Sequence, residues 1–90
     1  MSTVRIPPTL RPAANGAKTL EVDGATVGDV LASLVAAHPA IGPSVLAADG
    51  SLNRFVNVFV NGTDVRHLDD LATAVAPTDT VLLLPAMAGG

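Results

Sequence analysis

The sequence predicts an α+β domain in which one main helix packs on a mixed sheet of four to five strands. Two patterns carry this prediction: one amphipathic helical stripe, and several short apolar runs bounded by Gly, Pro, Asn and Asp. Because a helix with one apolar stripe has to bury it, the apolar runs before and after the helix are expected to form one covering sheet.

The composition limits the classes of protein that fit. Ninety residues, 49% of them hydrophobic and 14% charged, indicate one folded domain, which we place at residues 1–85 ahead of a tail at residues 86–90. The net charge of −3 argues against a nucleic-acid binder. The five cationic residues of the chain are expected to be separate and solvated on the surface: Arg5, Arg11, Lys18, Arg54 and Arg66. The chain has no cysteine, so it has no thiolate metal site and no thiol nucleophile. Without a signal peptide or a membrane-spanning run, we expect a cytoplasmic protein that does not bind membranes.

The first elements expected are two strands, at residues 3–6 and 18–22. In the first, Val4 and Ile6 share one face, and in the second, Leu20 and Val22 share one face while polar residues take the other. Prolines and an Asn-Gly pair separate the two strands. This arrangement predicts an antiparallel hairpin.

The main helix is expected to follow directly. Thr26 is a suitable N-cap, and Asp29 stands three residues later as in a capping box. The residues that form its apolar stripe are Val27, Val30, Leu31, Leu34 and Val35. His38, which precedes a proline, ends the helix, and we interpret it as a surface residue without a metal role.

The second half predicts a hairpin, a helical turn and a last strand. Residues 40–53 are irregular apart from one helical turn near Gly42. A strand at 55–60 and a short returning strand at 63–66 flank Asn61-Gly62, a strong hairpin signal. A capped helical turn beginning at Asp69-Asp70 precedes the last strand, where residues 81–84 form an apolar run that Pro85 ends. This order of elements is that of the β-grasp fold, as in ubiquitin.

The tail after Pro85 consists of small residues and ends in two glycines. Its members are Ala86, Met87, Ala88, Gly89 and Gly90. Extended, five residues reach roughly 17 Å, and a glycine backbone without Cβ atoms passes through a narrow channel. We interpret the tail as a handle whose Gly90 carboxylate enters the active site of a partner. A frayed terminus of ordinary small residues is the alternative.

A partner surface is expected on the face of the sheet away from the helix. If Val56, Val58, Val60, Val81 and Leu83 meet the helix, the two-residue period of a strand turns four large apolar side chains to the other face. They are Phe55, Phe59, Leu82 and Leu84. An exposed apolar patch of this size is typical of a binding site. The alternative is that the loop at 40–53 folds over part of it.

The chain resembles the ubiquitin-like sulfur carriers of the MoaD/ThiS superfamily, and among them most closely the CysO type. The resemblance spans nearly the whole chain and rests on five segments: residues 6–12, residues 54–61, residues 64–66, residues 71–75, and residues 84–90 with their Gly-Gly ending. One difference lies before the last strand. There the chain has Pro77-Thr78-Asp79 instead of the usual Asp-Gly-Asp, which puts the geometry of that turn in question.

The resemblance implies a carrier and not an enzyme. An E1-like adenylating enzyme of the MoeB/ThiF type would use ATP and magnesium to activate Gly90, and sulfur would then convert its carboxylate into a thiocarboxylate. In the CysO route the acceptor is similar to a pyridoxal-phosphate-dependent cysteine synthase, and a zinc-dependent peptidase releases the cysteine. The carrier itself would hold no cofactor and no metal.

Other destinations and functions remain open. The sulfur could go through a thiazole-synthase-like enzyme to thiamin, or to molybdopterin or a thiolated secondary metabolite. The chain could instead be a ubiquitin-like modifier joined to other proteins, or a β-grasp interaction module with an inert tail. No carboxylate pair or Ser-His arrangement points to catalysis.

Overall fold

The computed structural model describes residues 1–85, and residues 86–90 lie outside the described part. Its strands are β1 (Ser2–Arg5), β2 (Thr19–Val22), β3 (Val56–Val60), β4 (Thr63–Asp64) and β5 (Thr80–Pro85). Its helices are α1 (Val27–Ala37), α2 (Gly42–Val45) and the 3-10 turns η1 (Arg11–Ala14), η2 (Pro39–Ile41), η3 (Val65–His67) and η4 (Asp70–Ala72).

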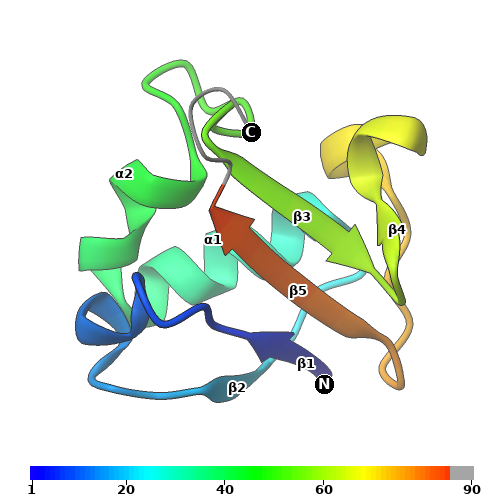
Figure 1. The fold of residues 1–90 in the computed structure, drawn as a ribbon. Coiled ribbons are helices and arrows are strands. Elements are labelled where there is room, and N and C mark those ends of the chain that lie inside the picture. The colour runs from blue at the N-terminus through cyan, green and yellow to red at the C-terminus, as the bar shows by residue number, and fades with distance from the viewer. Residues whose placement is uncertain (86–90) are drawn as a thin grey trace.

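The strands form one five-stranded mixed sheet in the order β2-β1-β5-β3-β4. The last strand in the chain, β5, is therefore the central one, parallel to β1 and antiparallel to β3. Helix α1 crosses one face of this sheet, as Figure 1 shows. The prediction of a mixed sheet packed on one main helix is confirmed.

Helix α1 begins and ends where the sequence predicts. The Oγ1 atom of Thr26 accepts a hydrogen bond from the Asp29 N–H at 3.2 Å, and His38 is the C-cap. Four of the five stripe residues are fully buried, and Val35 is half-buried. Burial of this stripe, more than helix propensity, is what stabilises an 11-residue helix.

The core lies between α1 and the sheet. Alternate residues of the two central strands are buried against the helix: Val56, Val58 and Val60 from β3, and Val81 and Leu83 from β5. Because side chains alternate along a strand, the residues between them point to the opposite face. The predicted division of the sheet into an inner and an outer face is confirmed for these strands.

The hairpin after β3 is present, but its second strand is shorter than predicted. Asn61 and Gly62 have φ values of 50° and 90°, which suit the tight turn predicted from this pair. Strand β4 ends at Asp64, and the expected strand at 63–66 is wrong beyond it. The Asp64 side chain accepts a hydrogen bond from the Arg66 N–H, which turns the chain into η3 and buries Val65 in the core.

The helical turn at Asp69-Asp70 is present as η4, but the predicted capping is wrong. Neither carboxylate caps the turn, and Asp70 has a φ of 53°. Instead, the Thr73 Oγ1 atom accepts a hydrogen bond from the Asp69 N–H at 3.1 Å. The Val27 N–H then donates to the Thr73 carbonyl, which ties this segment to the start of α1.

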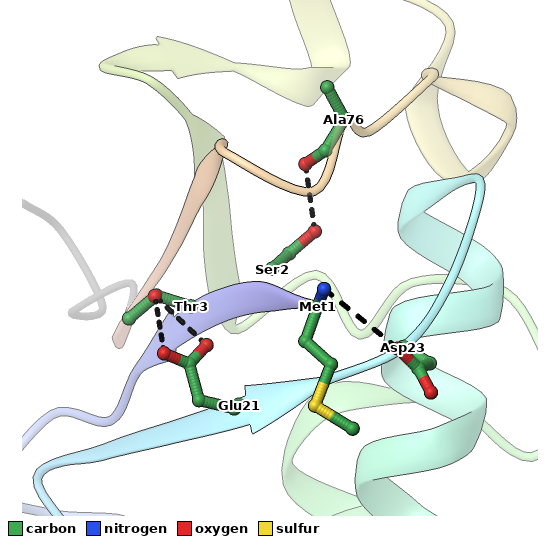
Figure 2. Close-up of polar contacts among 6 residues, drawn as sticks. All are labelled: Met1, Ser2, Thr3, Glu21, Asp23 and Ala76. Atoms are coloured by element: carbon green, nitrogen blue, oxygen red, sulfur yellow. Dashed lines mark hydrogen bonds and ion pairs between the residues drawn. The ribbon is translucent and has the colours of Figure 1, made fainter.

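Strand β1 is anchored on both sides (Figure 2). The buried Ser2 hydroxyl donates to the Ala76 carbonyl at 3.0 Å, and the Thr3 hydroxyl donates to the Glu21 carboxylate of β2. The ion pair between the N-terminal amine and Asp23 is long, at 4.0 Å, and exposed, so it contributes little. The Ser2 bond joins β1 to the segment that leads into β5.

Alanine substitutions of two neighbouring leucines in β5 test the assignment of an inner and an outer face of the sheet. We expect Leu83→Ala to lower the free energy of unfolding by about 2–5 kcal/mol, because it leaves a cavity in the core. Leu82→Ala removes the same atoms from the half-buried outer face and should cost about 1 kcal/mol or less. Urea denaturation of both variants makes the measurement. Equal losses would contradict the division of the sheet.

Candidate functional site

The candidate site begins where β5 ends. Pro85 pairs with Val56 at the start of β3, and both Leu84 and Pro85 are exposed. The predicted handle, residues 86–90 with Gly90 at its end, lies outside the described residues and remains a prediction. The end of the central strand is therefore accessible to a partner.

Three of the four predicted patch residues form one apolar surface on the outer face of the sheet. Phe59 of β3 is opposite Leu82 of β5, and Leu84 is two residues further along β5 on the same face. Phe59 and Leu82 are half-buried, and Leu84 is 39% exposed. We call Phe59, Leu82 and Leu84 the outer-face patch.

Phe55 is placed differently from the other three. It lies in the turn ahead of β3, is 57% exposed, and carries the Arg54 guanidinium 5.2 Å from the centre of its ring. Its N–H donates to the Asn53 side chain at 2.8 Å, which fixes the turn. Phe55 lines a hollow with Pro43 and Pro85, separate from the one beside Leu82. It therefore flanks the end of β5.

The loop at 40–53 does not border the hollow beside the outer-face patch. The residues around that hollow, next to Leu82 and Leu84, come from β1, from residues 6–11 and from the start of β2. Loop residues Pro43, Ser44 and Asn53 instead line the hollow at Phe55. The alternative of a covering loop therefore concerns the surroundings of Phe55.

Three cations converge on the hollow beside the patch. Arg5, Arg11 and Lys18 line it together with Leu82 and Leu84, so the expectation that these charges lie apart is wrong. The hairpin of β1 and β2 brings Arg5 next to Thr19, the neighbour of Lys18. Arg11 is held nearby because its Nε donates to the Ile6 carbonyl at 3.1 Å. Spacing along the sequence gave no sign of this convergence.

The turn that leads into β5 is held by one carboxylate. The Asp79 side chain accepts hydrogen bonds from the Ala76 N–H and from the Asn61 amide, each at 2.8 Å. The Asn61 side-chain oxygen in turn accepts from the Thr80 N–H at 3.0 Å. The bond from Ala76, and then that from Asn61, lower the pKa of Asp79. The turn is thus well defined although Pro77-Thr78 precede Asp79.

Residues 1–85 supply neither a metal cluster nor a membrane span. Within this range no three His, Asp or Glu residues come together in a way that would hold a metal ion. Among the same residues, no helix has both the length and the apolar character needed to cross a membrane.

Comparisons with known proteins agree with this geometry. Residues 4–90 match the model of the ThiS family. The sulfur carrier protein CysO of Mycobacterium tuberculosis is 44% identical over 90 residues, covering 98% of this chain and 97% of the relative. Small archaeal modifier protein 3 of Haloferax volcanii is 46% identical over 68 residues, covering 76% and 73%. A chain in the crystal structure of the Amycolatopsis orientalis BexX/CysO complex superposes with a TM-score of 0.91 at 39% identity, with 100% of both chains covered.

A mixed sheet on one helix, with an apolar outer face and an exposed end of its central strand, defines a β-grasp, ubiquitin-like protein. The chain belongs to the ThiS family of sulfur carrier proteins, and its full-length similarity is to the CysO type. It is accordingly a carrier and not an enzyme.

The bonds to Asp79 predict a pH dependence of stability. Because the pKa of Asp79 is lowered in the folded state, its carboxylate stabilises the fold above its unfolded pKa of 3.8, and this contribution disappears as the pH falls through the lower folded value. Asp79→Asn keeps one acceptor oxygen and so loses at least one of the two bonds. The wild type should be more stable than this variant at neutral pH.

Urea denaturation from neutral pH down to about pH 2 tests this dependence. The difference between wild type and Asp79→Asn should shrink as the pH falls below 3.8. The Ser51 side chain also lowers the pKa of Asp49. Because Asp49 is present in both proteins, its contribution cancels from the difference in stability. A difference that stays constant with pH would exclude the carboxylate of Asp79 as its source.

Proposed function

We propose that the carboxylate of Gly90 is the group that carries sulfur. The observation that carries this proposal is the family match, which extends through the Gly-Gly end of the chain at residue 90. The exposure of Leu84 and Pro85 supports it, because another protein can reach the end of β5. A glycine tail presents no side chain that would obstruct entry into a narrow active site.

The chemistry proceeds in two substitutions on an E1-like enzyme of the MoeB/ThiF type. A carboxylate oxygen of Gly90 attacks the α-phosphorus of ATP, and pyrophosphate leaves, with magnesium neutralising the phosphate charge. A sulfur nucleophile then attacks the acyl carbon, and AMP leaves. The resulting thiocarboxylate is ionised at neutral pH and is a better nucleophile than the original carboxylate. ATP and magnesium belong to the enzyme in this scheme.

Cysteine biosynthesis is the destination that we propose for the sulfur. Full-length similarity to a CysO protein supports it. The acceptor would be a pyridoxal-phosphate-dependent cysteine synthase, and a zinc-dependent peptidase would release the product. A thiazole-synthase-like enzyme, or enzymes of molybdopterin or secondary metabolism, would use the same thiocarboxylate. The relative in the BexX/CysO complex supports docking of such carriers onto a second protein.

The outer-face patch is the surface that we propose for docking onto the activating enzyme, with Phe55 at its edge. Phe59 lies on β3 and Leu82 and Leu84 lie on β5, which ends beside the start of β3. A protein that covers these side chains therefore also reaches the end of β5. Aromatic and aliphatic side chains of this kind supply binding free energy when a partner removes them from water.

Intact-protein mass spectrometry tests the proposed carrier chemistry. After incubation with an activating enzyme, ATP, magnesium and a sulfide source, we expect the mass increase that corresponds to replacement of one oxygen by sulfur. Deletion of Gly89 and Gly90 should abolish the increase, and an alanine added after Gly90 should do the same without removing a residue. If the wild-type mass stays unchanged while a known carrier reacts under the same conditions, the proposal is wrong.

A charge in the outer-face patch tests the docking surface. Phe59→Asp should weaken binding to the activating enzyme by at least about 10-fold, because a carboxylate would be buried at the interface. Its circular dichroism should be that of the wild type, since Phe59 points away from the core. Ser33→Glu, on the exposed side of α1, adds the same charge elsewhere and should bind normally. Equal affinity of both variants would contradict the assignment of the patch.

A protein modifier is the second candidate function. The similarity to small archaeal modifier protein 3 favours it, because the same β-grasp body and activated glycine also suit attachment to lysine amines. Immunoblots of cells that express a tagged chain should then show heavier conjugates, which disappear when Gly89 and Gly90 are deleted. A pure carrier gives only the free band.

A further inference from the structure

The hollow beside the outer-face patch concentrates positive charge on a protein that is negative overall. It measures about 370 Å³ and is lined by Arg5, Arg11 and Lys18, three of the five Lys and Arg residues of a chain with net charge −3. None of the eight Asp and Glu residues is among those that line it. Outside the hollow, the chain has eight Asp and Glu residues against two Arg residues, Arg54 and Arg66.

The cations of this hollow are not used to hold the fold by ion pairs. Within residues 1–85, the ion pair recorded is that of Met1 with Asp23, which lies elsewhere. The Nε of Arg11 is bonded to the Ile6 carbonyl, which leaves the rest of its guanidinium for a ligand. Arg5 and Lys18 are exposed. Three side chains without a carboxylate partner in the described structure are available to an anionic group.

Apolar side chains complete the hollow on its other side. Leu82 and Leu84, two members of the outer-face patch, form this wall, and register places Arg5 beside Leu82 on the same face of the sheet. A ligand that fits this wall carries both carboxylates and aliphatic groups, as an acidic protein segment does. A small anion such as phosphate would leave the leucines unused.

We propose that this hollow receives an acidic segment, with carboxylates flanked by apolar side chains, of the enzyme that activates Gly90. The inference rests on the proposed function and adds a chemical requirement on the partner. The net negative charge of the rest of the carrier repels such a segment, and the three cations of the hollow attract it. Charge complementarity of this kind orients an encounter and raises its rate. The segment thus docks with the end of β5 turned toward the active site.

Neutral substitutions in the hollow test the attraction directly. The double variant Arg5→Gln with Lys18→Gln removes two charges and leaves the bond of Arg11 intact. In steady-state thiocarboxylate formation at about 0.1 M salt, we expect its KM for the carrier to rise on the order of 10-fold with kcat unchanged. The difference should nearly vanish at about 1 M salt, where charges are screened.

The matched control changes net charge by the same amount on the other side of the molecule. Ser33→Glu with Ala36→Glu adds two negative charges on the exposed side of α1. In the same assay it should keep a KM within about twofold of the wild type, because at about 0.1 M salt the Debye length of about 10 Å screens charges on the exposed side of α1 from the hollow. Equal increases in KM for both double variants would overturn the proposal, as would no increase in either.

A second measurement does not depend on sulfur chemistry. In ¹⁵N NMR, a synthetic peptide of alternating Glu and Leu should shift the amides around Arg5, Arg11, Lys18 and Leu82, and a Lys-Leu peptide should not. Shifts spread over the whole surface, shifts with both peptides, or equal shifts with inorganic phosphate alone would overturn the proposal. If sedimentation shows that the wild type is a dimer and that the double Gln variant is a monomer, the hollow binds a second copy of this chain and the proposal is wrong. If no thiocarboxylate forms in the wild type, the proposed function fails, and a positive peptide result still establishes the acidic-segment site.

Discussion

The pairing of β5 with both β1 and β3 is the interaction on which the rest of the structure depends. Through it, the first and last strands of the chain lie side by side, and the β3–β4 hairpin joins the same sheet. The alternation along β5 then sends Leu83 into the core and Leu82 and Leu84 to the outer face. One strand thus supplies core packing and surface chemistry, so its register cannot shift without loss of both.

Two kinds of surface meet around the end of β5. The outer-face patch of Phe59, Leu82 and Leu84 provides apolar surface that a partner can bury, and the cations beside it can orient that partner. Apolar burial supplies most of the free energy of a docking event, whereas complementary charge mainly sets its rate and orientation. Both are adjacent to the end of β5, the last element of the described structure.

Local patterns in the sequence predict those elements that are determined by residues close together in the chain. The stripe of α1, its Thr26 cap and the Asn61-Gly62 turn depend on near neighbours, and each was found where expected. The end of β4 at Asp64 was missed because the Asp64 side chain competes with strand pairing by bonding the Arg66 N–H. The convergence of Arg5, Arg11 and Lys18 was missed because strand pairing and the path of residues 6–17 create it. The role of Asp79 likewise depends on Asn61, which is distant in the sequence.

The central position of β5 in the sheet has a consequence for folding during synthesis on the ribosome. Residue 3 pairs with residue 80, so a partly synthesised chain has the β1–β2 hairpin and α1 but no strand between them and β3. Such distant contacts also make folding slow relative to helical proteins of the same size. A polypeptide that ends before β5 would leave the edges of β1 and β3 unpaired, and such edges can pair with other chains. Synthesis of β5 and formation of the native sheet are thereby coupled.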